Sequence, residues 1–265
     1  MIQDNTQARK LNITMHEFFK VAVISALLAL PCVVWSGDRA NDPRSTGAES
    51  SKHANTGSSD LKNELLEIPL YRVMSLHEPE AYAMIVEHIS STNNNEPSLT
   101  DPRLGLRPVF QDILDRRMPF ASDDALRAFL SLILEQTSVL YDIDPELCDI
   151  YLGAYMNIDI DQRKIAGYFS PELLQKEHQI ISSVILSSYD GISSPPDENK
   201  MEPLRLMVFD KVQGQYNDAD KVLIDISYAI DHKGRYCVVN HALYQGMLDL
   251  PDEKSGDLIR YIFSE

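Results

Sequence analysis

Apolar residues recur at helical spacing along most of the chain, most clearly in the segment from Ser122 to Tyr141. Ser122 can accept a hydrogen bond from the first turn, and Asp123 and Asp124 suit the positive end of the helix dipole. Side chains three or four residues apart form one broad, mostly apolar face, which comprises Leu126, Phe129, Leu130, Leu132, Ile133, Leu134, Thr137, Val139 and Leu140. This pattern predicts a long helix at the centre of the domain.

Three further helices are expected to start where a proline is followed by a glutamate, at Pro79, Pro145 and Pro171. Proline suits the first turn of a helix because the N–H that it lacks has no intrahelical partner there, and the glutamate complements the positive helix end. The unequal separations of the three sites show no fixed period. We therefore predict no repeat architecture.

Shorter amphipathic segments complete the pattern. One begins after Asp60, one covers residues 101–118, and four lie in the last third of the chain at 203–212, 218–230, 236–250 and 254–263. Residues 222–230 are rich in β-branched side chains, but no partner strand is evident. We predict an all-α, irregular multi-helix domain at 60–188, a loop at 189–202 and a C-terminal helical subdomain at 203–265.

The N-terminal part contains an uncharged, mostly apolar run from Val21 to Trp35. As a helix it would rise about 22 Å, which is less than the roughly 30 Å hydrocarbon core but fits the apolar core of a secretory signal. Val34, Trp35 and Ser36 end the run with a small residue, as a signal peptidase requires. Residues 1–36 are therefore predicted to be a signal peptide cleaved after Ser36.

Two alternatives exist for this segment. An uncleaved signal anchor is possible because tilt and a snorkelling Lys20 can accommodate a short span. A lipoprotein acylated at Cys32 is less favoured because Leu30 and Pro31 precede the cysteine, where a small residue is required. In each case the chain is exported, either into the periplasm or tethered to the inner membrane facing outward. Residues 18–36 alone would contact the membrane, and residues 37–59, which have no large apolar side chain, are predicted to be a flexible linker.

The charge of the chain restricts its partners. The chain has 24 Lys and Arg against 40 Asp and Glu, a net charge of −16. Residues 1–36 contain three basic and two acidic residues, so 21 basic and 38 acidic residues remain after cleavage, or −17. Such a surface repels nucleic acid phosphates and anionic lipid headgroups, and it favours a basic protein partner.

Three cysteines occur in the sequence. Cys32 lies in the predicted signal, which leaves Cys148 and Cys237 in the exported part. An even pair outside the cytoplasm can form a disulfide. Two separate buried thiols that act as small apolar side chains are an equal alternative at this point.

The sequence shows no catalytic, cofactor or metal signature. No two histidines stand four residues apart around a glutamate, as a zinc protease helix requires, and no phosphate loop, dinucleotide fingerprint or nucleophile elbow is present. Asn157, Asp159 and Asp161 resemble the start of a calcium loop, but Gln162 replaces its glycine and Tyr168 its bidentate glutamate. We predict a solvated turn there and no cofactor.

These observations favour a non-enzymatic, exported or membrane-tethered helical protein that binds another protein. A cell-envelope hydrolase that uses paired carboxylates is the alternative, because such a pair is defined in space and not by spacing in the sequence. A structural membrane-associated subunit is the third possibility. The twelve tyrosines are expected mainly at helix seams, although tyrosine also suits a binding face.

Overall fold

The fold is described from a computed structural model, which defines residues 57–93, 106–153, 165, 167–190 and 196–264. Every regular element in these ranges is a helix and none is a strand, so the predicted all-α class is confirmed. None of these helices combines the length and the apolar character needed to cross a bilayer. The predicted signal or anchor at 1–36, the cleavage after Ser36 and the alternative at Cys32 fall outside the described residues. The same holds for residues 37–56 of the predicted linker.

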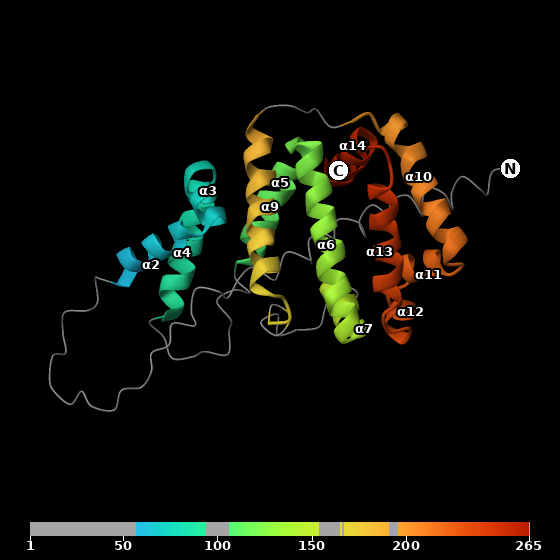
Figure 1. The fold of residues 1–265 in the computed structure, drawn as a ribbon, viewed down its shortest axis with the longest axis horizontal. Coiled ribbons are helices and arrows are strands. Elements are labelled where there is room, and N and C mark those ends of the chain that lie inside the picture. Colours follow the sequence, from blue (N-terminus) through green and yellow to red (C-terminus); the bar gives the residue numbers. More distant parts are fainter. Residues whose placement is uncertain (1–56, 94–105, 154–164, 166, 191–195, 265) are drawn as a thin grey trace.

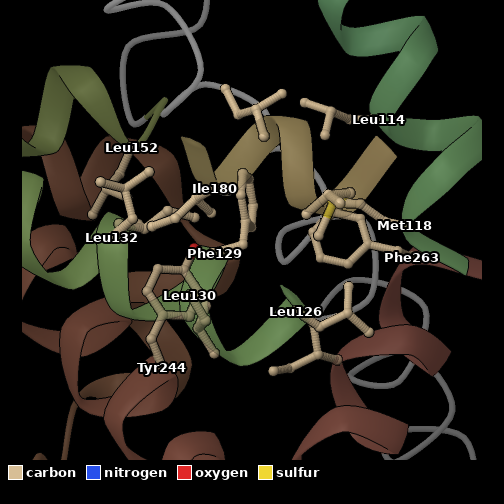
Figure 2. Packing of buried hydrophobic residues seen from close by; sticks show 14 of the residues in the cluster. Leu114, Met118, Leu126, Phe129, Leu130, Leu132, Leu152, Ile180, Tyr244 and Phe263 are labelled. Atoms are coloured by element: carbon tan, nitrogen blue, oxygen red, sulfur yellow. The ribbon is translucent and has the colours of Figure 1, made fainter. Parts of the chain in front are cut away.

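The central helix of the fold is α6 (Asp123–Ile143). Helix α9 (Pro171–Tyr189) packs along one side of it, and α13 (Arg235–Leu248) and α14 (Asp252–Ser264) pack along the other (Figure 1). The predicted apolar face of α6 is buried, and Phe129 and Leu130 lie in the same cluster as Tyr244 of α13 (Figure 2). The predicted central position of this helix is therefore confirmed.

The predicted helix starts are present with their capping bonds. Ser122 accepts a hydrogen bond from the amide of Ala125 at 3.3 Å at the start of α6. Asp144 accepts one from the amide of Glu146 at 2.9 Å at the start of α7 (Pro145–Tyr151), and Ser170 accepts one from Leu173 at 3.2 Å at the start of α9. These contacts explain why local sequence located the starts well, because each cap bonds within its own first turn.

The N-terminal helices are α2 (Gly57–Glu67), α3 (Pro69–His77), α4 (Pro79–Asn93), α5 (Arg107–Arg117) and the 3₁₀ turn η3 (Met118–Phe120). Helix α2 begins at Gly57, so the predicted helix start after Asp60 and the predicted end of the linker at residue 59 are wrong. Asp60 lies within the first turn, where a carboxylate also complements the helix dipole. Pro79 is the first residue of α4, as predicted.

The N-terminal helices are joined to α9 through Glu78, which lies between α3 and α4 and is buried. Its carboxylate accepts hydrogen bonds from Arg116, at 3.2 Å, and from Arg117, both at the end of α5. The hydroxyl of Tyr189 on α9 donates to Glu78 at 3.2 Å. The guanidinium of Arg117 also lies over the Tyr189 ring, 4.0 Å from its centroid. Opposite charges and one aromatic ring therefore hold α3, α5 and α9 together.

Helix α10 (Glu198–Gln215) begins five residues before the predicted start at 203, so the predicted loop 189–202 is too long. Asp197 caps it by accepting a hydrogen bond from the amide of Asn199 at 3.0 Å. Pro203 therefore lies inside the helix and not at its start. The proline is exposed, so water can solvate the carbonyl of Asn199 that lacks an N–H partner.

The predicted helix at 218–230 is divided into α11 (Ala219–Ile224) and α12 (Ile226–Asp231). Asp225 causes the break, because its side chain accepts hydrogen bonds from the amides of Ser227 at 3.0 Å and Tyr228 at 3.2 Å and so starts a new helix. No strand forms at residues 222–230. Residues before and after 189–202 contribute to one buried cluster, in which Met118 lies beside Phe263 (Figure 2). A separately folding C-terminal subdomain stays a prediction.

Candidate functional site: a groove between helices α6, α10 and α13

An open groove of about 390 Å³ lies where the ends of α6 and α10 meet the side of α13. Helix α6 contributes Ser138, Tyr141 and Asp142, and the end of α10 contributes Lys211, Val212, Gln215 and Tyr216. Helix α13 and its C-cap contribute Cys237, Val238, His241, Ala242, Gln245, Gly246 and Asp249. We call this feature the α13 groove.

Gly246 brings α10 and α13 close together along the α13 groove. A Cβ atom at this position would lie 3.0 Å from Cγ1 of Val208 on α10, closer than ordinary van der Waals contact. A larger residue at 246 would therefore require the Val208 side chain to shift by a few tenths of an ångström. The preference for glycine here comes from the space between the helices and not from the backbone angles of Gly246.

An ion pair joins the two helices at the exposed edge of the groove. Lys211 of α10 donates to Asp249 at 2.7 Å, and Gln245 donates to the other carboxylate oxygen at 2.8 Å. The hydrogen bond from Lys211, followed by that from Gln245, lowers the pKa of Asp249 below its usual 3.8. Both the lysine charge and the Asp249 charge are therefore already matched within the protein.

Asp142 is the other charged residue that lines the groove. It is exposed in the last turn of α6, and within the ranges that the structure defines it has neither an ion-pair nor a hydrogen-bond partner. Tyr141, beside it, is 37% exposed. An unpaired carboxylate next to an exposed aromatic ring can attract a positively charged ligand.

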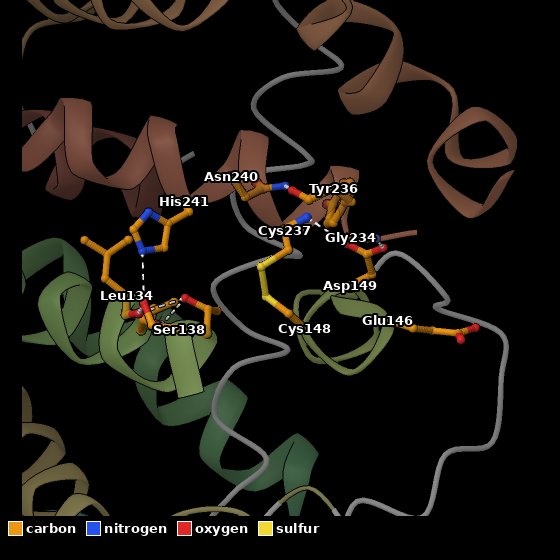
Figure 3. The surroundings of a disulfide bond; sticks show 12 residues. Leu134, Ser138, Glu146, Cys148, Asp149, Gly234, Tyr236, Cys237, Asn240 and His241 are labelled. Atoms are coloured by element: carbon orange, nitrogen blue, oxygen red, sulfur yellow. Dashed lines mark hydrogen bonds between the residues drawn. A yellow bond between two sulfur atoms is a disulfide. The ribbon is translucent and has the colours of Figure 1, made fainter. Parts of the chain in front are cut away.

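The groove also contains a serine and a histidine in contact (Figure 3). Nε2 of His241 lies 3.2 Å from the hydroxyl oxygen of Ser138, and Ser138 itself donates to the carbonyl of Leu134 at 2.7 Å. Because the serine proton is used within α6, the imidazole must donate to the serine oxygen. Burial lowers the pKa of His241 below its usual 6.5, so the ring is neutral at pH 7. The contact is thus a positioning hydrogen bond and not a base that activates a nucleophile.

Helix α13 is fixed at its start by a disulfide to α7. Cys148 and Cys237 are joined with their Cα atoms 5.6 Å apart, so of the two sequence alternatives the structure has the disulfide. The neighbouring Asp149 accepts hydrogen bonds from the amides of Gly234 and, at 2.7 Å, of Cys237 (Figure 3). Asp149, which belongs to α7, thus caps the N-terminus of α13. Burial raises the pKa of Asp149 to about 6. The helix that contributes more lining residues to the groove than α6 or α10 is therefore held in place at its start.

Gly234 allows this close junction. It has a φ of +78°, in the left-handed region, and a Cβ atom there would lie 2.5 Å from Cβ of Pro145. Both the backbone angle and the space require glycine. Lys233 beside it forms a 2.6 Å ion pair with Glu146, which adds a surface contact between the same two helices.

A second buried polar group lies between α6 and α9. Glu177 accepts a hydrogen bond from Gln136 at 2.9 Å, and the hydroxyl of Tyr151 donates to Gln136 at 2.6 Å. Burial raises the pKa of Glu177 to about 8 and lowers that of the neighbouring His178 to about 4. Both residues are thus uncharged at pH 7. The only sequence signal for Glu177 was its place on the apolar face of a helix, between Leu173 and Ile181.

Three carboxylates that lie close together in the sequence make contacts that stabilise the fold. Asp144 caps α7, Glu146 pairs with Lys233, and Asp149 caps α13. Among the residues with a defined position, no three side chains of His, Cys, Asp or Glu form a metal site. The calcium-like Asn157, Asp159, Asp161 and Gln162 lie outside the described residues. Tyr168, which replaces the bidentate ligand, is exposed.

The described tyrosines lie both in the core and along the α13 groove. Five are buried in the core: Tyr71, Tyr151, Tyr236, Tyr244 and Tyr261. Tyr141 and Tyr216 line the α13 groove, a position that spacing along the sequence could not reveal.

Comparison of the chain with protein-family models, with curated proteins and with solved structures found no match. The fold and the site geometry therefore carry the functional interpretation alone.

Proposed function

We propose that this protein binds another protein through the α13 groove and catalyses no reaction. The carrying observation is the groove itself, which is open to solvent and lined from three helices by tyrosines, amides and an unmatched aspartate. Such a mixture of aromatic and polar side chains around a hollow is typical of recognition surfaces. The rigid attachment of α13 supports binding, because a preformed site loses little freedom when a partner docks.

Export to the periplasm, in soluble or tethered form, is part of the same proposal. It rests on the apolar run from Val21 to Trp35, and the Cys148–Cys237 disulfide is compatible with an oxidising compartment. A basic partner is favoured because the chain carries a net charge of −16, which speeds encounter with a cationic surface.

The hydrolase alternative has less support from the groove. Asp142 and Asp249 both line it, but glycoside cleavage needs one carboxyl group that keeps its proton, and Lys211 lowers the pKa of Asp249. Incubation of the protein with peptidoglycan, followed by separation of soluble fragments, tests this alternative directly. Fragments that disappear in Asp142→Asn would favour the hydrolase over the binding protein.

The binding proposal is tested with two matched tryptophan variants of α10. Gln215 is exposed and lines the groove, whereas Gln213 is exposed on the same helix and does not. Proteins captured from an envelope extract by the immobilised wild-type chain should be lost with Gln215→Trp, because the indole fills the groove, and retained with Gln213→Trp. Partners that bind Gln215→Trp as tightly as the wild type would show that the groove is not the binding site.

A further inference from the structure

The charges that line the α13 groove leave one negative charge unmatched. Lys211 and Asp249 neutralise each other at 2.7 Å, and His241 is neutral at pH 7 because burial lowers its pKa. Asp142 alone remains, in the last turn of α6. The negative end of the α6 dipole adds to the potential at this point. The groove is therefore complementary to a single positive charge.

The aromatic residues beside Asp142 restrict the kind of cation. Tyr141 and Tyr216 both line the groove, and the face of a tyrosine ring attracts a guanidinium or an ammonium group. Planar guanidinium in particular can stack on a ring while it bonds to a carboxylate. A hydrated metal ion would need several oxygen ligands, and the defined part of the chain has no such group.

The protein itself already contains this arrangement next to the groove. The guanidinium of Arg235 lies 4.8 Å from the centroid of the Tyr216 ring and forms an ion pair with Asp218. The hydrogen bond from Arg235 lowers the pKa of Asp218, which shows that the carboxylate is stabilised as the anion. Tyr141 and Asp142 offer the same two groups, an aromatic ring and a carboxylate, with no cation between them.

We infer that Asp142 and Tyr141 in the α13 groove take a lysine or arginine side chain of the partner, with arginine preferred. This inference rests on the proposed function and specifies the chemistry of the partner. The cation would pair with Asp142 and cover the ring of Tyr141. A basic segment with an arginine at the contact point is then the ligand that the groove selects.

The first test uses methylguanidinium, the head of an arginine side chain, and methylurea, a neutral molecule of nearly the same shape. Both are titrated into the ¹⁵N-labelled chain as purified from its host. Methylguanidinium should shift the amide signals of Tyr141 and Asp142, and methylurea should not. Equal shifts with both molecules, or no shift with methylguanidinium at low salt, would overturn the inference.

The second test uses Asp142→Asn with Asp210→Asn as its control. Asp210 is exposed on α10 and does not line the groove, so both variants lose one negative charge from the surface. Asp142→Asn should weaken methylguanidinium binding about three- to fivefold, as expected for a solvent-exposed charge pair, and Asp210→Asn should leave it within the error. Equal effects of the two variants would mean that only net charge attracts the cation.

The two proposals fail in different ways. A captured partner that Gln215→Trp loses but Asp142→Asn binds unchanged would leave protein binding intact and overturn the cation site. Methylguanidinium binding at Asp142 without any partner that depends on Gln215 would show a cation site that serves no protein partner, and it would overturn the inference as stated. Loss of the partner in both variants, with Gln213→Trp and Asp210→Asn unaffected, supports both.

Discussion

Two seams of this protein each contain a buried carboxyl group, and the two groups are held differently. In the seam between α7 and α13, the oxygens of Asp149 accept two backbone amides, and burial raises its pKa to about 6. In the seam between α6 and α9, only one carboxyl oxygen of Glu177 accepts a hydrogen bond, from Gln136. Burial raises the pKa of Glu177 to about 8. No described residue bonds to the second oxygen of Glu177.

The difference shows what a buried carboxylate requires. Burial penalises the charged form in both places, and each hydrogen bond to an oxygen offsets part of that penalty. Two amides at the positive end of a helix keep Asp149 mostly ionised at pH 7. A single amide of Gln136 does not, so Glu177 is mostly protonated there. The seam between α7 and α13 also contains the disulfide, whereas the seam between α6 and α9 contains none.

Removal of the disulfide should have the largest effect. The two cysteines are 89 residues apart, and a crosslink that closes a loop of this length is expected to stabilise the fold by about 4–5 kcal/mol. Cys148→Ala with Cys237→Ala should lower the free energy of unfolding in urea by about that amount. A loss below about 1 kcal/mol would mean that Asp149 and the ion pairs alone hold the α7–α13 seam.

Glu177→Gln should stabilise the protein at pH 7. The folded pKa of about 8 exceeds the ordinary 4.5, so the stability that protonated Glu177 contributes is present below pH 4.5 and is lost as the pH rises to about 8. Glutamine cannot ionise and keeps the bond to Gln136. The variant should gain about 3 kcal/mol at pH 7 and none at pH 4, as measured by urea unfolding at both values. Glu87→Gln, at an exposed position, should change neither value.

Asp149→Asn should give a smaller gain at pH 7. Its folded pKa of about 6 also exceeds the ordinary 3.8, so its contribution to stability is lost between about pH 4 and pH 6. Asparagine removes this pH dependence but has one carbonyl oxygen for two amides, and the lost hydrogen bond costs about 1–2 kcal/mol. We expect a net gain of about 1 kcal/mol at pH 7 and a net loss at pH 4. A gain equal to that of Glu177→Gln would contradict the role of the two amides.

The ion pair at the edge of the groove should have the smallest effect. Lys211 and Asp249 are both exposed, and such pairs typically contribute less than about 1 kcal/mol. A double-mutant cycle of Lys211→Ala and Asp249→Ala, with thermal unfolding as the measurement, should give a coupling in that range. A coupling of about 3 kcal/mol would instead make this pair a principal link between α10 and α13.

The parts of the fold that local sequence determines could be predicted. Ser122, Asp144 and Ser170 bond within their own first turns, so the starts of α6, α7 and α9 were found. The start of α10 and the break at Asp225 were missed because an aspartate cap competed there with proline and with an apolar pattern. At each position the helix boundary depends on whether the aspartate cap or the competing pattern is stronger, and the sequence alone does not show which one is.

The candidate site could not be predicted in the same way. Ser138 and His241 are 103 residues apart, and only the packing of α13 on α6 brings them into contact. The disulfide was one of two alternatives because the distance between Cys148 and Cys237 was unknown. Asp142 is one acidic residue among many in the sequence, and only the pairing of Lys211 with Asp249 leaves it as the unpaired charge that lines the groove.

The junction at Gly234 has a consequence for finding related proteins. Glycine at 234 is required by backbone angle and by the nearness of Pro145, and Cys237 and Asp149 are tied to the same place by the disulfide and by hydrogen bonds. We therefore expect chains with this fold to vary less at this junction than at surface positions. A short pattern, Pro-x-x-Cys-Asp followed at a distance by Gly-x-x-Cys, is therefore the signature by which distant homologues could be identified.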